Sequence, residues 1–173
     1  IEGPAVMQLS AIFEADWAFA CRKKGEVQRP IKSVPEFQGG EPSTIEIMVS
    51  GPDTRGDPLY EKILSIIQEA EKSVTIVTPY FIPDEVLQRS LMVKARSGKS
   101  VRLLIPRRSN HPITDLARND FLRELSEAGV EILLFNDGMM HGKVVLVDED
   151  IAMTGSANID LRSLFVNYEL AAF

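Results

Sequence analysis

Helical and strand-like hydrophobic patterns alternate along the chain from residue 58 onwards. Amphipathic helices are predicted over 58–70, 84–98 and 113–128, because apolar residues recur there every three or four positions. Short apolar runs, typical of buried strands, separate and follow these helices. The runs are 74–78, 101–105, 130–135, 144–147 and 167–173. The alternation predicts an α/β fold with a mixed, largely parallel sheet and helices on both faces.

The first part of the chain has a different pattern. Residues 4–22 predict one helix, and residues 25–44 contain proline and glycine without hydrophobic periodicity. A strand is predicted over 45–50. We therefore expect an N-terminal helix and irregular connection over 1–44, followed by an α/β domain over 45–173.

Composition restricts the class of protein. The chain has 173 residues, of which 45% are hydrophobic, so it can bury a substantial core. Its formal net charge of −6 argues against broad, non-specific binding of nucleic acid, which usually needs a basic surface. A local cationic pocket remains compatible with that charge. No apolar run reaches the ~20 residues of a transmembrane helix, and no segment resembles a signal peptide.

The densest group of chemically active residues surrounds a short apolar strand. His141 and Lys143 precede it, and alternation along an extended chain places both on the same face. A second segment, 154–158, adds a tight turn, a hydroxyl and an amide. Asn158 and Asp160 are expected to begin helical turns whose N–H groups point into the same space. This combination predicts a phosphate-binding site that contains a nucleophile.

The spacing of these residues resembles the signature of the phospholipase D superfamily. That signature is His-x-Lys, four residues, Asp, six residues and Gly-Ser-x-Asn, and all six fixed positions match. They are His141, Lys143, Asp148, Gly155, Ser156 and Asn158. Such a match is expected by chance on the order of once in ten million start positions or more rarely. A polar strand end followed by an ordinary turn is therefore a poor alternative explanation.

The resemblance implies a reaction at a phosphodiester. His141 would attack the phosphorus and form a covalent phosphohistidine, while Lys143, Ser156 and Asn158 hold the non-bridging oxygens. A second histidine would protonate the leaving alkoxide and then activate the incoming water or alcohol. The scheme requires no metal and no cofactor, and no cluster of cysteine and histidine suggests one.

Three further residues have supporting roles. Glu169 lies on a predicted strand among apolar neighbours, where a carboxylate needs a partner. A nucleophilic imidazole needs an acceptor for its other ring N–H, so we expect Glu169 to pair with His141. The alternative is an exposed carboxylate on an edge strand. By resemblance, Asp148 is a structural ion-pair partner on the opposite strand face, and Gly155 belongs to the structural part of the signature.

Two loops after predicted strands carry candidate rim residues. One contains Tyr80, whose ring belongs either to a pocket wall or to the core. The other contains Arg107, Arg108 and His111, which suit an anionic substrate or else form a solvated loop. His111 is followed by Pro-Ile, so it cannot supply a second signature.

Several segments resemble the second half of bacterial cardiolipin synthases, and the resemblance covers nearly the whole chain. They are 1–6, 13–17, 50–53, 78–83 and 127–130. Proteins of the superfamily contain two signatures, either in one chain or one in each subunit of a dimer, and this sequence contains one. The resemblance implies an excised C-terminal half of a phosphatidyltransferase. The parent enzyme would join two phosphatidylglycerols into cardiolipin and release glycerol.

The same resemblance implies the partners and the location. The substrate would be a phospholipid, with phosphatidylglycerol expected, and the partner a missing first-signature half or a homodimer mate. The parent would associate with the bacterial cytoplasmic membrane, whereas this fragment is expected to be soluble. Two alternatives are a single-signature homodimeric phosphodiesterase or nuclease, which the acidic charge disfavours, and a non-catalytic domain that binds phosphate or lipid headgroups. Turnover of phosphatidylglycerol, of DNA or of neither separates the three.

Overall fold

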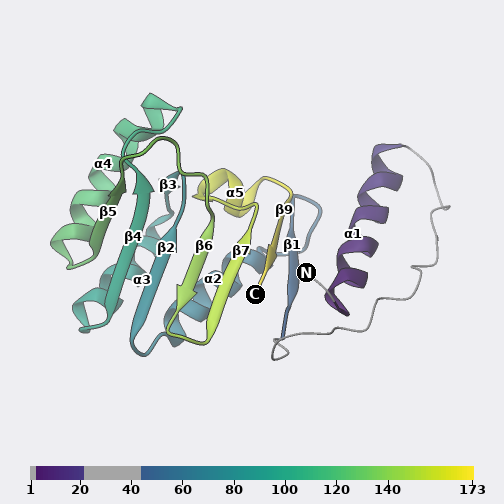
Figure 1. Cartoon of the computed structure of the whole chain (residues 1–173), viewed down its shortest axis with the longest axis horizontal. Helices are drawn as coiled ribbons and strands as arrows, with labels where there is room; N and C mark the ends of the chain where they lie inside the picture. Colours follow the sequence, from purple (N-terminus) through teal and green to yellow (C-terminus); the bar gives the residue numbers. More distant parts are fainter. Residues whose placement is uncertain (1–2, 22–43) are drawn as a thin grey trace. The chain divides into compact units, whose positions relative to one another are not determined.

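The computed structural model describes residues 3–21 and 44–173, which fall into two compact units. The first unit, residues 1–47, contains α1 (Ala5–Ala20), and the second comprises residues 48–173 (Figure 1). Apart from Thr44, the predicted irregular connection lies outside the described residues. Within the described part, no helix is both long enough and apolar enough to cross a membrane.

From residue 47 onwards the chain forms strands and helices, and four strands follow one another directly before the last helix (Figure 1). The helices are α2 (Pro58–Glu69), α3 (Glu85–Arg96), α4 (Pro112–Glu127) and α5 (Leu161–Phe165). The strands are β1 (Ile47–Ser50), β2 (Ser73–Val77), β3 (Phe81–Ile82), β4 (Ser100–Pro106), β5 (Glu131–Phe135), β6 (Val144–Val147), β7 (Ile151–Gly155), β8 (Ile159–Asp160) and β9 (Glu169–Ala172). The predicted helices and strands are all present, with boundaries that differ by a few residues.

Seven strands form one mixed sheet in the order β1-β9-β7-β6-β2-β4-β5, and β3 and β8 pair separately. The prediction of an α/β fold with a mixed sheet is confirmed. Its description as largely parallel is wrong, because parallel pairing in the main sheet joins β2, β4 and β5, whereas β2–β6, β6–β7 and β7–β9 are antiparallel. The turn of residues 148–150 joins β6 to β7, and so short a connection can join only antiparallel strands.

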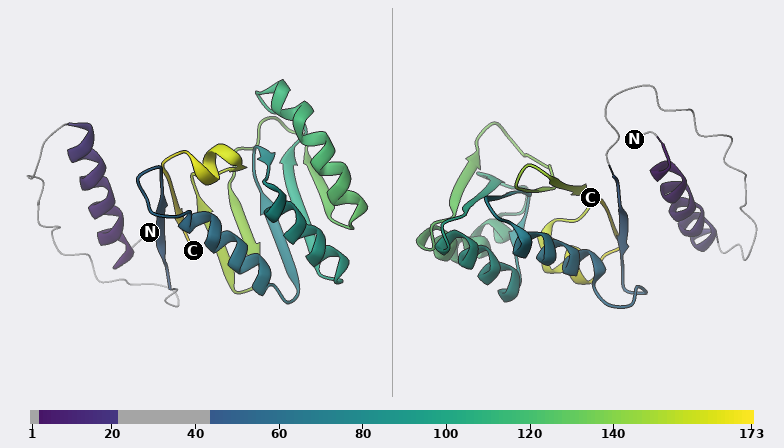
Figure 2. Two further views of the ribbon diagram at one scale, coloured as in Figure 1. Left: turned by 180° about the vertical axis from the view of Figure 1, so that it is seen from behind. Right: turned by 90° about the horizontal axis from the view of Figure 1, so that it is seen from below.

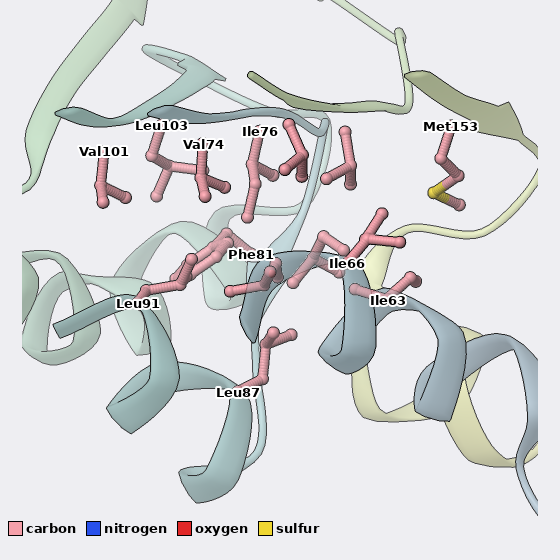
Figure 3. Packing of buried hydrophobic residues seen from close by; sticks show 14 of the residues in the cluster. Ile63, Ile66, Val74, Ile76, Phe81, Leu87, Leu91, Val101, Leu103 and Met153 are labelled. Atoms are coloured by element: carbon pink, nitrogen blue, oxygen red, sulfur yellow. The ribbon is translucent and has the colours of Figure 1, made fainter. Parts of the chain in front are cut away.

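The four helices of the second unit pack side by side on one face of the sheet (Figure 2). The predicted covering of both faces is therefore not found within residues 48–173. Burial along the strands agrees with this arrangement, since Val74 and Ile76 are buried whereas Thr75 between them is partly exposed. In Figure 3 the apolar side chains of β2 and β4 point toward α2 and α3, with Phe81 among them. Packing of this face of the sheet against the helices fixes the positions of the strand ends, where the candidate site residues lie.

Asp148 ties the β6–β7 turn to the loop before β2. Its φ is 53°, and its carboxylate accepts hydrogen bonds from the backbone N–H groups of Glu71, Lys72 and Ser73 at 2.9, 2.8 and 2.7 Å. These hydrogen bonds lower the pKa of the Asp148 carboxyl from its ordinary value. Its observed partners in these bonds are backbone amides rather than the cation that the resemblance implied.

We expect Asp148→Asn to destabilise the fold at neutral pH, because asparagine tolerates the positive φ but lacks the charge that the three amides bind. The folded-state pKa lies below the unfolded value of about 3.9, so the stabilisation exists above that pH and disappears as pH falls through the folded pKa. The difference in urea midpoint between wild type and variant should therefore shrink in acid. Asp150→Asn, exposed in the same turn, is the matched control. Equal midpoints at neutral pH would contradict this role.

Candidate active site

His141 and Lys143 lie in the extended segment that leads into β6. Lys143 Nζ is 3.1 Å from Nδ1 and 3.5 Å from Nε2 of the His141 ring, and it donates to the His141 carbonyl oxygen over 3.1 Å. The two side chains therefore meet on one side of the chain, as alternation predicts. The donor and acceptor roles of the two ring nitrogens depend on the tautomer, and a nitrogen that carries its lone pair is able to act as a nucleophile.

The ammonium group of Lys143 is partly buried and faces two carboxylates. Burial lowers the pKa of Lys143, while the charges of Glu169 and Asp160 act in the opposite direction. A negative charge nearby favours the protonated form of a lysine. In that form Lys143 can donate a hydrogen bond to a phosphate oxygen.

β7 and β9 bring Ser156 and Glu169 together. Ser156 Oγ donates to Glu169 Oε2 and accepts from the backbone N–H of Leu170 over 3.0 Å. The other carboxylate oxygen of Glu169 accepts from Asn167 Nδ2 over 3.2 Å. Glu169 is therefore held within electrostatic reach of Lys143, and its pairing with His141 stays a prediction.

Gly155 lies where β7 meets β9 at very short range. A Cβ at this position would be 2.2 Å from the carbonyl oxygen of Leu170 and 2.7 Å from the Cα of Ala171, and both of these atoms belong to the backbone. The close approach also allows the Ser156 N–H to donate to the Leu170 carbonyl oxygen over 2.9 Å. Only glycine permits this junction, which places Ser156 beside Glu169.

Gly155→Ala should therefore lower the free energy of unfolding by roughly 1–3 kcal/mol or more, because overpacking must displace a strand. Gly142→Ala is the matched control, since a Cβ there would meet Val77 Cγ1 at 3.5 Å, an ordinary contact. Chemical denaturation of both variants measures the difference. Equal stability of the two variants would contradict the close approach.

Asn158 and Asp160 lie in the segment between β7 and α5. Asp160 Oδ1 accepts from the Ser163 N–H over 2.8 Å and caps α5, as predicted for a helix-start residue. Asn158 instead donates from Nδ2 to Ser163 Oγ over 3.2 Å. Its Oδ1 is buried and has no hydrogen-bond partner among the residues that the structure describes. The side chain of Asn158 is thus held by Ser163 through its amide nitrogen.

The four candidate rim residues separate into two groups. The Tyr80 ring lies 6.4 Å from the His141 ring and 5.4 Å from the His111 ring, between centroids. Tyr80 and His111 also line a cavity of about 540 Å³ that reaches Asn158. Arg107 and Arg108 are exposed and are not part of that lining. Tyr80 is therefore part of a pocket wall, rather than of the core.

Thr78 is a residue of this region that the sequence patterns do not identify. It is fully buried after β2, where its Oγ1 donates to the Tyr80 carbonyl oxygen over 2.8 Å and accepts from the Ile159 N–H over 3.2 Å. Thr78 thus joins the loop that carries Tyr80 to the segment that carries Asn158. A polar residue between a strand and Pro79 is the only sequence signal, and it is weak.

The loop that carries His111 is held from α4. Arg118 is buried, donates to the Arg107 carbonyl oxygen over 2.9 Å and pairs with Asp115 over 3.1 Å. Asp115 in turn accepts from the Ser109 N–H over 2.8 Å.

No group of histidine, cysteine and acidic residues suited to a metal ion occurs in residues 3–21 or 44–173.

The family described as "Cardiolipin synthase, PLD-like domain" matches residues 63–173. Cardiolipin synthase of Geobacillus thermodenitrificans is 37% identical over 176 residues, which cover 100% of this chain and 34% of that protein. Cardiolipin synthase A of Buchnera aphidicola is 33% identical over 170 residues, which cover 98% and 35%. The chain thus spans about a third of the length of these curated relatives.

Solved structures agree with the family match at the level of fold. Nuc from Salmonella typhimurium, a phospholipase D family member, has a TM-score of 0.60 at 22% identity, over 75% of this chain and 80% of that one. Phosphatidylserine synthase of Haemophilus influenzae has a TM-score of 0.59 at 18% identity, over 74% and 34%. With the single signature of His141 and Lys143, these findings show that the chain belongs to the phospholipase D-like domain family of cardiolipin synthases.

Proposed function

We propose that this chain supplies one half of the active site of a phosphatidyltransferase that makes cardiolipin. The observation that supports the proposal is the contact between Lys143 Nζ and the His141 ring, because the proposal assigns the nucleophile to His141 and the phosphate-binding cation to Lys143. The curated relatives are named cardiolipin synthases, and the chain matches them over its whole length. Membrane association of the parent protein belongs to the same proposal.

In the first half-reaction, a lone pair of the His141 ring attacks the phosphorus of phosphatidylglycerol. A P–N bond forms, the P–O bond to glycerol breaks, and the leaving alkoxide takes a proton from a second histidine. Lys143 stabilises the negative charge that develops on the non-bridging oxygens. In the second half-reaction, a hydroxyl of another phosphatidylglycerol returns a proton to the second histidine and attacks the phosphorus. The P–N bond breaks, which gives cardiolipin and free His141.

The second histidine must come from outside this signature, because His111 lacks the x-Lys that follows His141. We infer that it belongs to a half with a second signature, in the same reading frame or in a second copy of this chain. This chain together with that half is called the two-signature enzyme.

The test is to supply the two-signature enzyme with phosphatidylglycerol vesicles and, separately, with DNA. We expect cardiolipin and glycerol in equal amounts, and no cleavage of DNA. Cleavage of DNA without turnover of lipid would identify a nuclease. No turnover of either, together with binding of anionic vesicles, would identify a headgroup-binding domain.

Glu169→Gln should lower the pKa of Lys143 further, because the carboxylate charge now favours the ammonium form. Lys143 must be protonated to act, so the alkaline decline of kcat/KM should move to lower pH. If Glu169 also pairs with His141, the pKa of His141 should fall in an NMR titration. Glu149→Gln, exposed in the β6–β7 turn, is the matched control. An unchanged pH profile would contradict the coupling to Lys143, and an unchanged His141 pKa would contradict the pairing.

A further inference from the structure

The loops that follow β2, β4 and β5 lie at the end of the sheet that carries His141 (Figure 1). β2, β4 and β5 are parallel, and β6 starts at this end because Val144 pairs with Val77. Ring contacts link the loops, since the Tyr80 ring lies 6.4 Å from that of His141 and 5.4 Å from that of His111. α4 begins directly after His111. The first turn of α4 therefore lies at the same end of the sheet as the proposed nucleophile.

This turn exposes two large apolar side chains. Ile113 is 85% exposed and Leu116 is 74% exposed. Residues three positions apart in a helix are neighbours on one face, so the two side chains form one small apolar surface, here called the α4 tip. The buried face of α4 carries Arg118 and Leu125 instead. Burial of the α4 tip in an apolar environment would therefore be favourable and is not supplied by the rest of residues 48–173.

Exposed basic side chains lie in the loop before the α4 tip. They are Arg107 and Arg108, and neither pairs with a carboxylate among the described residues. Asp115, in the first turn of α4, is instead paired with the buried Arg118 over 3.1 Å. The neighbouring loop after β5 contributes one exposed acid, Asp137. These loops are thus locally basic, although the chain as a whole has a net charge of −6.

An apolar tip beside exposed arginines matches the chemistry of an anionic membrane surface. At such a surface, aliphatic side chains enter the boundary between headgroups and acyl chains, while basic side chains bind the anionic headgroups. The proposed substrate, phosphatidylglycerol, is an anionic lipid whose phosphate lies in the headgroup layer. A nucleophile that attacks this phosphate within a bilayer must have the surface around it turned toward the lipid.

We propose that the α4 tip docks this chain on an anionic lipid bilayer. Its two side chains enter the boundary between headgroups and acyl chains, while Arg107 and Arg108 bind the phosphates of neighbouring lipids. Docking in this way turns the end of the sheet that carries His141 toward the headgroups. The inference rests on the proposed phosphatidyl transfer and adds the surface by which the site reaches a lipid in the bilayer.

Flotation of this 173-residue chain with lipid vesicles measures docking without any turnover. We expect binding to vesicles that contain phosphatidylglycerol, a decrease in that binding as salt rises, and little binding to phosphatidylcholine alone. The double variant Ile113→Ser, Leu116→Ser should lower the partition coefficient on the order of tenfold, because the apolar contact is lost. Arg107→Gln with Arg108→Gln should lower it by a similar factor on anionic vesicles.

Two variants away from this surface are matched controls. Val93→Ser removes an apolar side chain that is 63% exposed on α3. Lys99→Gln removes a positive charge in the turn between α3 and β4, at the opposite end of the sheet. Both controls should bind anionic vesicles as wild type does. Unfolding curves of all four variants should match that of wild type, because every replaced residue is exposed.

The two-signature enzyme provides a second readout. The Ile113→Ser, Leu116→Ser variant should lose rate on phosphatidylglycerol in bilayer vesicles, again on the order of tenfold. It should keep the wild-type rate on a short-chain phosphatidylglycerol dispersed as monomers, because a monomeric lipid requires no docking. A loss on both forms of the lipid would mean that the α4 tip acts on the chemistry itself, and it would contradict a docking role.

A wild-type chain that does not bind anionic vesicles at low salt, or equal binding by wild type and both double variants, would overturn this inference alone. So would variants of the α4 tip that bind vesicles normally but assemble poorly with the second-signature half, since the tip would then contact protein. A wild-type two-signature enzyme that turns over neither form of phosphatidylglycerol would overturn the proposed function. Flotation of the chain would still decide whether the α4 tip binds a membrane.

Discussion

His141→Ala should abolish turnover by the two-signature enzyme, with a fall in kcat/KM of roughly 10³-fold or more. Without the ring no P–N bond can form. The second alcohol would then have to displace glycerol from the phosphorus directly, and no group would hold that alcohol in position for the attack. His141 is exposed in the segment that leads into β6, so loss of the fold is a weak explanation for such a loss of turnover. Unfolding curves of the variant should therefore match those of wild type.

His111→Ala is the matched control, because His111 is the other histidine of the chain. It lines the cavity and contacts Tyr80 but makes or breaks no bond in the proposed scheme, so its loss should change the rate by less than about tenfold. Comparable rates for the two histidine variants would remove His141 from its assigned role.

Lys143→Met should lower kcat/KM by about 10²–10³-fold, which corresponds to about 3–4 kcal/mol of lost transition-state stabilisation. Methionine keeps most of the length of the side chain but removes the charge that faces the phosphate. The loss should appear mainly in kcat, because the charge on the phosphoryl oxygens increases in the transition state. Lys143→Arg should restore part of the rate.

Lys99→Met is a suitable control, since Lys99 lies in the turn between α3 and β4 and outside the candidate site. Both lysine variants lose one positive charge, so a general electrostatic effect on vesicle binding would appear in each. A near-normal rate for Lys143→Met would exclude Lys143 from the chemistry.

The long elements of this fold could be predicted because their periodicity is local. α2 and α3 bury regularly spaced apolar residues, and Asp84 caps α3 as its position before the helix suggests. β3 and β8 could not be predicted, because each has two residues and exists through the pairing of Phe81 with Ile159. The short α5 has five residues, and the sequence indicated only its start, through the cap residue Asp160.

The candidate site was predictable to the extent that sequence spacing determines it. The signature alone predicts that the His141 and Lys143 side chains lie together, because side chains two positions apart on an extended chain share a face. The contact between Ser156 and Glu169 depends on how β7 pairs with β9, which sequence does not reveal. The cavity near Thr114 depends on the packing of α4 and has no local signal.

The most direct test of the central claim is to trap the covalent intermediate. The two-signature enzyme is mixed with phosphatidylglycerol labelled at phosphorus, quenched in base within one turnover, and digested for peptide mapping. We predict acid-labile label on the peptide that contains His141, and none on that peptide in His141→Ala. Full turnover by wild type with no label on the His141 peptide would contradict the phosphohistidine mechanism proposed for this chain.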